Sequence, residues 1–193
     1  MVIPKLNIVS ALAALVFFFL PWVSIECNGK RLATQTGVQM IVGATTPNPA
    51  FQSRMPTPRK EEKQSLGASY LAAAALIAVA SALLVAFAGL IKGSSDDEFG
   101  AGILCTMALA FLLLQLALGF PAKREMQRAL DERGQVSQQK NALEPLEKSI
   151  AEQLAGGLEI RPTQWFYLEL AALGIPVLIL GNALLDRIKA KET

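Results

Sequence analysis

The sequence predicts an all-α membrane protein, a four-helix transmembrane bundle with a small cap made of a β-hairpin and helices. Four long apolar stretches cover roughly residues 6–23, 66–91, 101–120 and 165–185. A hydrocarbon core about 30 Å thick needs about 20 apolar residues in a helix, and all four stretches approach or exceed that length. Aromatic residues typical of membrane interfaces stand at one end of these stretches, and they are Trp22, Tyr70, Trp165 and Tyr167.

The aromatic residues also predict how the loops are distributed. If consecutive spans alternate in direction, all four aromatic residues lie at the same interface. Both long loops, residues 24–65 and 122–164, then lie on that side and form the cap of a single membrane domain covering residues 1–193.

The first stretch is interpreted as a retained helix rather than a cleaved signal peptide. Pro21 and Trp22 stand where small residues would precede a cleavage site. Buried helices of a soluble protein are the alternative for all four stretches. Such helices rarely run this long without charge, and Glu169 is the only charged residue within any span.

A β-hairpin is predicted directly after the first span. Val23, Ile25 and Cys27 alternate with polar residues, and the pair Asn28-Gly29 is the preferred sequence of a type I′ turn. Residues 158–160 could add a third strand to this hairpin. Residues 36–43 continue as an apolar segment, for which a short helix against the bilayer surface is expected.

The remaining loop segments are expected to differ in structure. Four prolines make residues 45–58 an extended linker, either a plain spacer or a strap for a partner. Residues 122–133 are expected to extend the third helix, and residues 143–154 carry apolar side chains at helical spacing. The acidic turn at residues 94–98 is expected to cap the start of the third helix.

Small side chains recur every four residues along the two central spans. Such ladders allow close approach of helix backbones, which is how helices associate in lipid. We expect them to face neighbouring helices, of this chain or another. The ladder positions are Ala74, Ala78, Ala82 and Ala86 on the second span, and Gly102, Thr106 and Ala110 on the third.

Polar residues within the spans fall at two depths. Gln115 and Glu169 lie about five residues from the same interface on antiparallel spans, so a hydrogen bond between them is predicted. Intramembrane ionisable groups are functional candidates. Glu169 is therefore expected to hold helices together, to extend its carboxyl group toward the interface, to pair with a base such as Arg161, or to form a proton or substrate site. Ser10, Thr106 and Asn182 form a second level, where interhelical hydrogen bonds are expected. Gly174 and Pro176 are expected to bend the fourth span.

Composition argues against several chemistries. The chain has no His, which argues against His-ligated haem or copper, most zinc sites and His-based nucleophilic catalysis. Cys27 and Cys105 lie near opposite ends of their spans, too far apart for a disulfide. We expect no cofactor and no metal. Basic and acidic residues are interleaved, so nucleic-acid binding has no support.

Charge gives two conflicting indications of orientation. The loop side carries thirteen of the 18 Lys and Arg residues and the other side five, which by simple count puts the loops in the cytoplasm. The five basic residues of the other side, however, lie on very short segments close to the spans. The tendency of basic residues to stay in the cytoplasm is strongest there. We therefore expect a bacterial cytoplasmic membrane protein with cytoplasmic termini and exported loops.

The layout resembles the claudin-type tetraspan arrangement. The resemblance consists of a hairpin-bearing first loop after a helix closed by Trp22, the nearby Cys27, and a very short second loop. The paired loop cysteines and the Gly-Leu-Trp element of that family are missing, so the resemblance concerns topology and implies no activity. The stretch from Leu20 to Gly37 also resembles a segment of small bacterial membrane proteins.

These features predict a non-catalytic integral membrane subunit. It is expected to contact lipid and to associate with itself or with a larger membrane protein complex. The alternative is a small transporter or channel-like oligomer that uses Glu169 and Gln115. An enzyme has the least support, because no activated nucleophile or metal site is recognisable.

Overall fold

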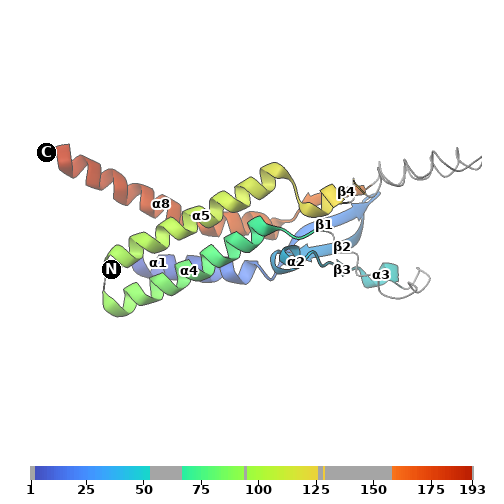
Figure 1. Cartoon of the computed structure of the whole chain (residues 1–193), viewed down its shortest axis with the longest axis horizontal. Helices are drawn as coiled ribbons and strands as arrows, with labels where there is room; N and C mark the ends of the chain where they lie inside the picture. The colour runs from blue at the N-terminus through green and yellow to red at the C-terminus, as the bar shows by residue number, and fades with distance from the viewer. Residues whose placement is uncertain (1–2, 53–66, 94, 126–127, 129–157, 193) are drawn as a thin grey trace, which may run out of the picture. The chain divides into compact units, whose positions relative to one another are not determined.

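The computed structural model describes residues 3–52, 67–93, 95–125, 128 and 158–192. The chain divides into two compact units, each described by itself below. A helical unit comprises Met1–Leu20, Tyr70–Leu118 and Gln164–Thr193, and a sheet unit comprises Pro21–Ser69 and Gly119–Thr163. Both units are assembled from segments far apart in the sequence (Figure 1).

The helical unit contains four helices. They are α1 (Ile3–Phe17), α4 (Tyr70–Lys92), α5 (Ser95–Leu118) and α8 (Gln164–Glu192). Helix α4 packs along α5, α8 packs against α5 and α1, and α1 also contacts α4. The interior is built largely from small residues, since five alanines, one valine and one glycine form the buried side of α4.

Three of these helices are long and apolar enough to cross a bilayer, namely α4, α5 and the part of α8 from Gln164 to Leu185. They support a multi-pass membrane protein. Helix α1 has 15 residues and is about 22 Å long at 1.5 Å per residue, short of the hydrocarbon thickness. The prediction of a helical span over residues 6–23 is therefore wrong in its extent. Proline at position 21 cannot continue the helix ladder, and the alternating residues after it extend into a strand.

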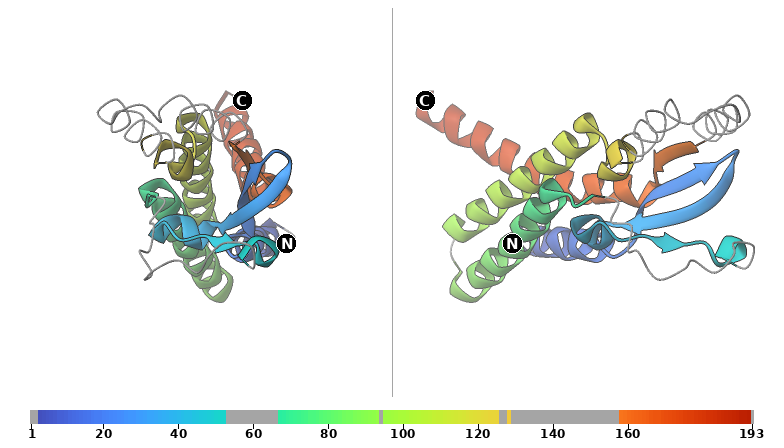
Figure 2. Two further views of the ribbon diagram at one scale, coloured as in Figure 1. Left: turned by 90° about the vertical axis from the view of Figure 1, so that its right-hand side faces the viewer. Right: turned by 45° about the vertical axis from the view of Figure 1, so that its right-hand side comes forward.

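The sheet unit is a four-stranded antiparallel sheet. Its strands are β1 (Pro21–Cys27), β2 (Lys30–Thr36), β3 (Thr46–Pro47) and β4 (Leu158–Pro162), in the order β3-β2-β1-β4. The predicted hairpin and its third strand are confirmed (Figure 2). Both turn residues, Asn28 (φ 50°) and Gly29 (φ 73°), have the positive φ that a type I′ turn requires. The additional strand β3 was not predicted.

The predicted short helix after the hairpin is confirmed as α2 (Gly37–Val42). Its start is fixed by a capping box, because Thr36 Oγ1 accepts from the Gln39 amide and Gln39 Oε1 accepts from the Thr36 amide. Its end is Gly43, whose φ of 72° suits a left-handed cap. Buried Gln35 donates to the carbonyl oxygen of Ala44 at 2.8 Å and ties the turn after α2 to the sheet.

Only parts of the other loop predictions fall on described residues. Helix α3 (Pro49–Gln52) lies within the segment predicted to be an extended linker. Residues 121–125 are helical, as expected for the start of the segment 122–133. Strand β3 also lies within the predicted linker, whereas residues 53–58 of the linker and the predicted helix at residues 143–154 lie outside the described residues.

Candidate functional site

Glu169 is a buried ionisable residue of the helical unit. It lies on α8, its side chain is fully buried, and neither carboxylate oxygen has a hydrogen-bond partner among the described residues. A carboxylate without a partner is among the most expensive groups to place inside a membrane protein. Glu169 is therefore the residue in this unit that most needs an explanation beyond packing.

Gln115 on α5 is also buried, but the hydrogen bond predicted between it and Glu169 is not formed. Its side chain is 1% exposed, yet the carboxylate oxygens of Glu169 accept no hydrogen bond from any described residue. The two side chains are thus brought into the same core without pairing.

The predicted equal depth of these two residues agrees with the packing of α5 on α8. A Cβ atom placed on Gly102 would lie 3.5 Å from Leu180, which fixes the antiparallel register of the helices. Gln115 follows Gly102 by thirteen residues, about 20 Å, and Glu169 precedes Leu180 by eleven, about 17 Å. The two levels therefore differ by about 3 Å, less than one helical turn.

A hydroxyl group on α1 compensates for the proline in α8. Pro176 lies inside α8 and lacks the amide that would donate to the carbonyl oxygen of Ala172, four residues earlier. Ser10 Oγ donates a hydrogen bond to that same carbonyl oxygen. Ser10 was predicted to bond between helices, and here it satisfies the backbone group that the proline leaves free.

Helices α1 and α8 are antiparallel and keep one register over two turns. The Ser10–Ala172 contact and the tilted ring pair Phe17–Trp165, with centroids 6.5 Å apart, are separated by seven residues on each helix. This register places Glu169 at the level of Ala13, which is half-buried and adjoins the fully buried Ala14. The side chains of α1 at this level are therefore small.

Asn7 is a further buried polar residue of the helical unit, and it was not predicted from the sequence. It lies one turn before Ser10 on α1, is 5% exposed, and its Oδ1 has no hydrogen-bond partner among the described residues. The signal was its spacing of three residues from Ser10, which places the two side chains on one face of a helix. Asn7, Ser10 and Glu169 thus form a polar line through the α1–α8 packing.

The other two residues of the predicted second polar level do not bond between helices. Thr106 Oγ1 donates to the carbonyl oxygen of Gly102 in its own helix at 2.8 Å. Asn182 is exposed on α8 and no hydrogen bond links its amide to a described residue. The reason is that residues 182–185 of α8 are all exposed and leave the bundle, as the diverging end of α8 shows (Figures 1 and 2).

The small residues of the α4 ladder are largely buried against other helices of this chain. Ala78, Ala82 and Ala86 are buried, and Ala74 is half-buried. On α5, Gly102 is buried against Leu180, Thr106 is half-buried and Ala110 is exposed. The buried side of α5 runs instead through the residues Ala101, Cys105, Ala108, Leu112 and Gln115.

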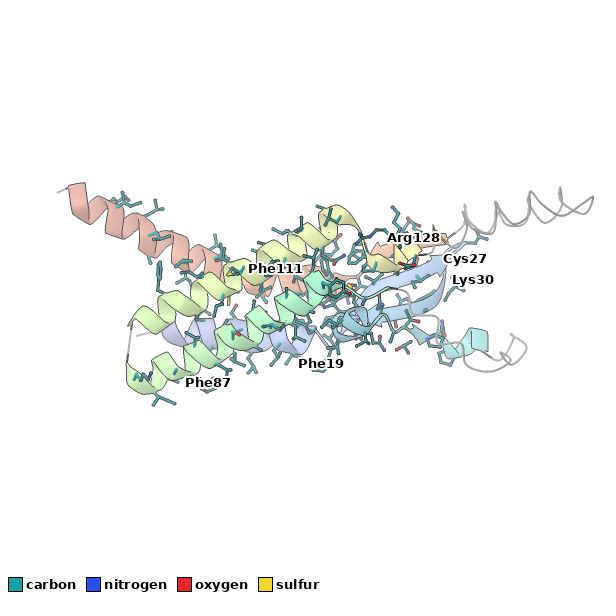
Figure 3. The ribbon with its side chains drawn as sticks, in the orientation of Figure 1. Phe19, Cys27, Lys30, Phe87, Phe111 and Arg128 are labelled. Carbon is teal, nitrogen blue, oxygen red and sulfur yellow. The ribbon has the colours of Figure 1, made fainter. Side chains whose placement is uncertain are left out.

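The predicted interface anchors differ in exposure. Tyr70 and Tyr167 are 86% and 52% exposed, and Trp165 is half-buried beside Phe17. Trp22, the remaining predicted anchor, is fully buried in β1. Large apolar side chains such as Phe19 and Phe87 are exposed on the helical unit (Figure 3).

Arg161, considered as a partner for Glu169, belongs to the sheet unit and pairs elsewhere. Its guanidinium lies 2.7 Å from the carboxylate of Glu159, two residues earlier on β4. That hydrogen bond and charge raise the pKa of Arg161, with a smaller contribution from Glu26. Both partners are more than half exposed, so the pair contributes little to stability.

Other reactive groups form no recognisable site in the described part of the chain. Cys27 is half-buried, Cys105 is buried, and both thiols are free. Among the described residues no group of three Cys, Asp or Glu side chains could hold a metal ion. Neither a scan against protein-family models nor a search of curated proteins finds a match.

Proposed function

We propose that this chain is a non-catalytic integral membrane subunit that associates with itself or with a larger membrane protein complex. The observation that carries the proposal is the sheet unit. Segments far apart in the sequence, Pro21–Pro47 and Leu158–Pro162, join in one sheet, in which Asn28 and Gly29 form the hairpin turn and a capping box starts α2. An ordered module of this kind on a membrane anchor suits recognition of a partner.

The proposal includes a four-span topology, with α1 as the fourth crossing. The support is that α1 packs against α8 and α4 and that the apolar residues Phe18, Phe19 and Leu20 follow its last turn. We place the chain in a bacterial cytoplasmic membrane, with both termini in the cytoplasm and the sheet unit exported.

Purification from native membranes tests the proposed function. The tagged full-length chain should co-purify in fixed stoichiometry with itself or with other polypeptides, identified by mass spectrometry. Glu169→Gln should leave this assembly intact, and Glu159→Gln on the sheet is the matched control for loss of one carboxylate. Recovery of a monomer without partners from mild detergent would contradict the proposal.

A small transporter or channel-like oligomer is the second candidate, and the unpartnered carboxylate of Glu169 favours it. A transported proton or cation would supply the charge that the described core lacks. Reconstituted vesicles should then show flux of protons or monovalent cations that Glu169→Gln abolishes and Glu159→Gln preserves. Equal permeability of vesicles with and without the protein would reject this candidate.

A further inference from the structure

Glu169 lies in a closely packed, apolar part of the helical unit. One turn away on the same side of α8 are Phe166, Ala172 and Leu173, which are at most 8% exposed. Leu112, at nearly the same level on α5, is fully buried. The carboxyl group is itself fully buried, and neither oxygen has a hydrogen-bond partner among the described residues. In such surroundings an ionised carboxylate is far more costly than its neutral form.

The helices that pack against α8 bring no positive charge close to Glu169 in the described part of the chain. These helices are α1 and α5. In the register of α1 on α8, Lys5 lies at the level of residue 177, eight residues or about 12 Å from Glu169 along the axis. Cys105 on α5 is buried and interacts electrostatically with Glu169, but a thiol has no positively charged form. The other titratable residues of the helical unit are exposed tyrosines or lie at its opposite end, and they are Tyr70, Tyr167, Lys92, residues 96–98 and the charged residues within 186–192.

A metal ion does not fit these surroundings. Ca²⁺ and Mg²⁺ take about six or more oxygen ligands, and the carboxyl group supplies only its own pair of oxygens. No group of three Cys, Asp or Glu side chains in the described ranges could complete such a set. Ser10 Oγ, the hydroxyl one turn away along α1, already donates to the carbonyl oxygen of Ala172. A proton needs no further ligand, because it forms an O–H bond with one carboxylate oxygen and removes the charge.

We propose that Glu169 is a proton-binding site, occupied at neutral pH, whose neutral form stabilises the packing of α8 on α1 and α5. This role goes beyond the subunit function proposed above and does not depend on it. Glu169 follows Gln164, the first residue of the span, by five residues, about 8 Å, and precedes Leu185, the last, by sixteen, about 24 Å. The proton is therefore exchanged at the Gln164 end of α8, which is the exported end in the proposed orientation.

Proton binding at Glu169 makes the stability of the helical unit depend on pH. The folded state holds a proton that an unperturbed glutamate releases at about pH 4. Where the folded state binds more protons than the unfolded state, the free energy of unfolding falls as pH rises. The folding equilibrium constant, taken relative to that of Glu169→Gln, should therefore fall by up to about tenfold per pH unit above the ordinary titration range of glutamate. Glutamine has nearly the same shape as glutamic acid and carries no titrating proton.

Infrared difference spectroscopy of the full chain in lipid detects the proton directly. The spectrum of the wild type minus that of Glu169→Gln at neutral pH isolates the bands of this carboxyl group. We expect the C=O stretching band of a protonated acid, which shifts when H₂O is replaced by D₂O. Glu159→Gln is the matched control, because it removes an exposed carboxylate that pairs with Arg161, and its difference spectrum should contain carboxylate bands only.

Two results would overturn the proton site. One is a set of carboxylate bands in place of the acid band at neutral pH, and Glu169→Leu isolates the same bands if Glu169→Gln folds poorly. The other is an equal pH dependence of unfolding in wild type and Glu169→Gln, measured in detergent from acidic to alkaline pH. Neither measurement requires a partner, so a native assembly with an ionised Glu169 rejects the proton site alone. A protonated Glu169 in a monomer without partners confirms the proton site and rejects the subunit function alone.

Discussion

Ser10 and Pro176 lie on different helices, yet both act on the carbonyl oxygen of Ala172. The proline removes the amide that would donate to this oxygen, and the serine hydroxyl donates instead. Without either donor the carbonyl would be buried in a low-dielectric core with no hydrogen bond, which is unfavourable. The two residues are therefore coupled energetically although they are far apart in sequence.

This coupling predicts a strongly non-additive double mutant. Ser10→Ala alone should lower the free energy of unfolding by about 1 kcal/mol, the scale of an interhelical hydrogen bond in a membrane protein. In a Pro176→Ala background the new amide can donate to Ala172, so Ser10→Ala should cost close to nothing. Unfolding in detergent of the four proteins measures the cycle, and an equal cost in both backgrounds would refute the coupling.

Glu169 and Gln115 are both buried polar residues, but they should respond differently to replacement by leucine. Glu169→Leu removes a carboxyl group with no hydrogen-bond partner, so stability should rise by about 1–3 kcal/mol. Gln115→Leu is the comparison, since Gln115 is buried and takes part in an interaction within the chain, and stability should fall. Thermal unfolding in one detergent measures both, and destabilisation by Glu169→Leu would show that the carboxyl group has a stabilising partner.

Residue-level features were predictable where one helix determines them. The depth of Gln115 and Glu169 follows from residue counts and is consistent with the register of α5 on α8. Whether their side chains pair could not be predicted, because pairing depends on the direction of two side chains on different helices. The exposure of Asn182 was also unpredictable, since it depends on where α8 leaves the bundle.

At the level of elements, the turn of the β1–β2 hairpin and the helix α8 depend on glycine in opposite ways. A Cβ atom would meet nothing within 4 Å at Gly29 or at Gly174, so alanine tests the backbone alone at both positions. Gly29 has φ of 73°, which is unfavourable for alanine, whereas Gly174 is helical.

Alanine at these two positions should therefore shift stability in opposite directions. Gly29→Ala should destabilise the sheet by about 1 kcal/mol, and Gly174→Ala should stabilise α8 by up to about 1 kcal/mol. Hydrogen exchange of the amides in β1, β2 and α8 measures the stability changes of the hairpin and of the helix separately. A neutral Gly29→Ala would contradict a turn that requires positive φ.

Elements were predictable where a local signal defined them. Alternation and Asn28-Gly29 define the hairpin, and the segment at 158–160 matched a strand that pairs with β1. The end of α1 was misplaced because hydrophobicity continues through Trp22, although Pro21 marks the break and Trp22 is buried in the sheet unit. Strand β3 has two residues and pairs with β2 among the described strands, so no local sequence pattern indicates it.

At the scale of the whole molecule, the proposed topology makes α1 a membrane crossing. Four crossings place the N-terminus and Cys27 on opposite sides, whereas three crossings by α4, α5 and α8 place them on the same side. An impermeant maleimide applied to intact cells should label Cys27, which is half-buried, and not a cysteine added at the N-terminus. Labelling of both without permeabilisation would reject the fourth crossing.

The central claim is that the chain acts as a subunit, with its helical unit as an anchor and its sheet as a recognition module. Native-membrane purification with quantitative mass spectrometry tests this claim most directly. We expect a stoichiometric assembly, of the chain with itself or with other polypeptides, that survives Glu169→Gln. A monomer recovered without partners, whose only measurable property is a flux lost in Glu169→Gln, would contradict it and favour the transporter.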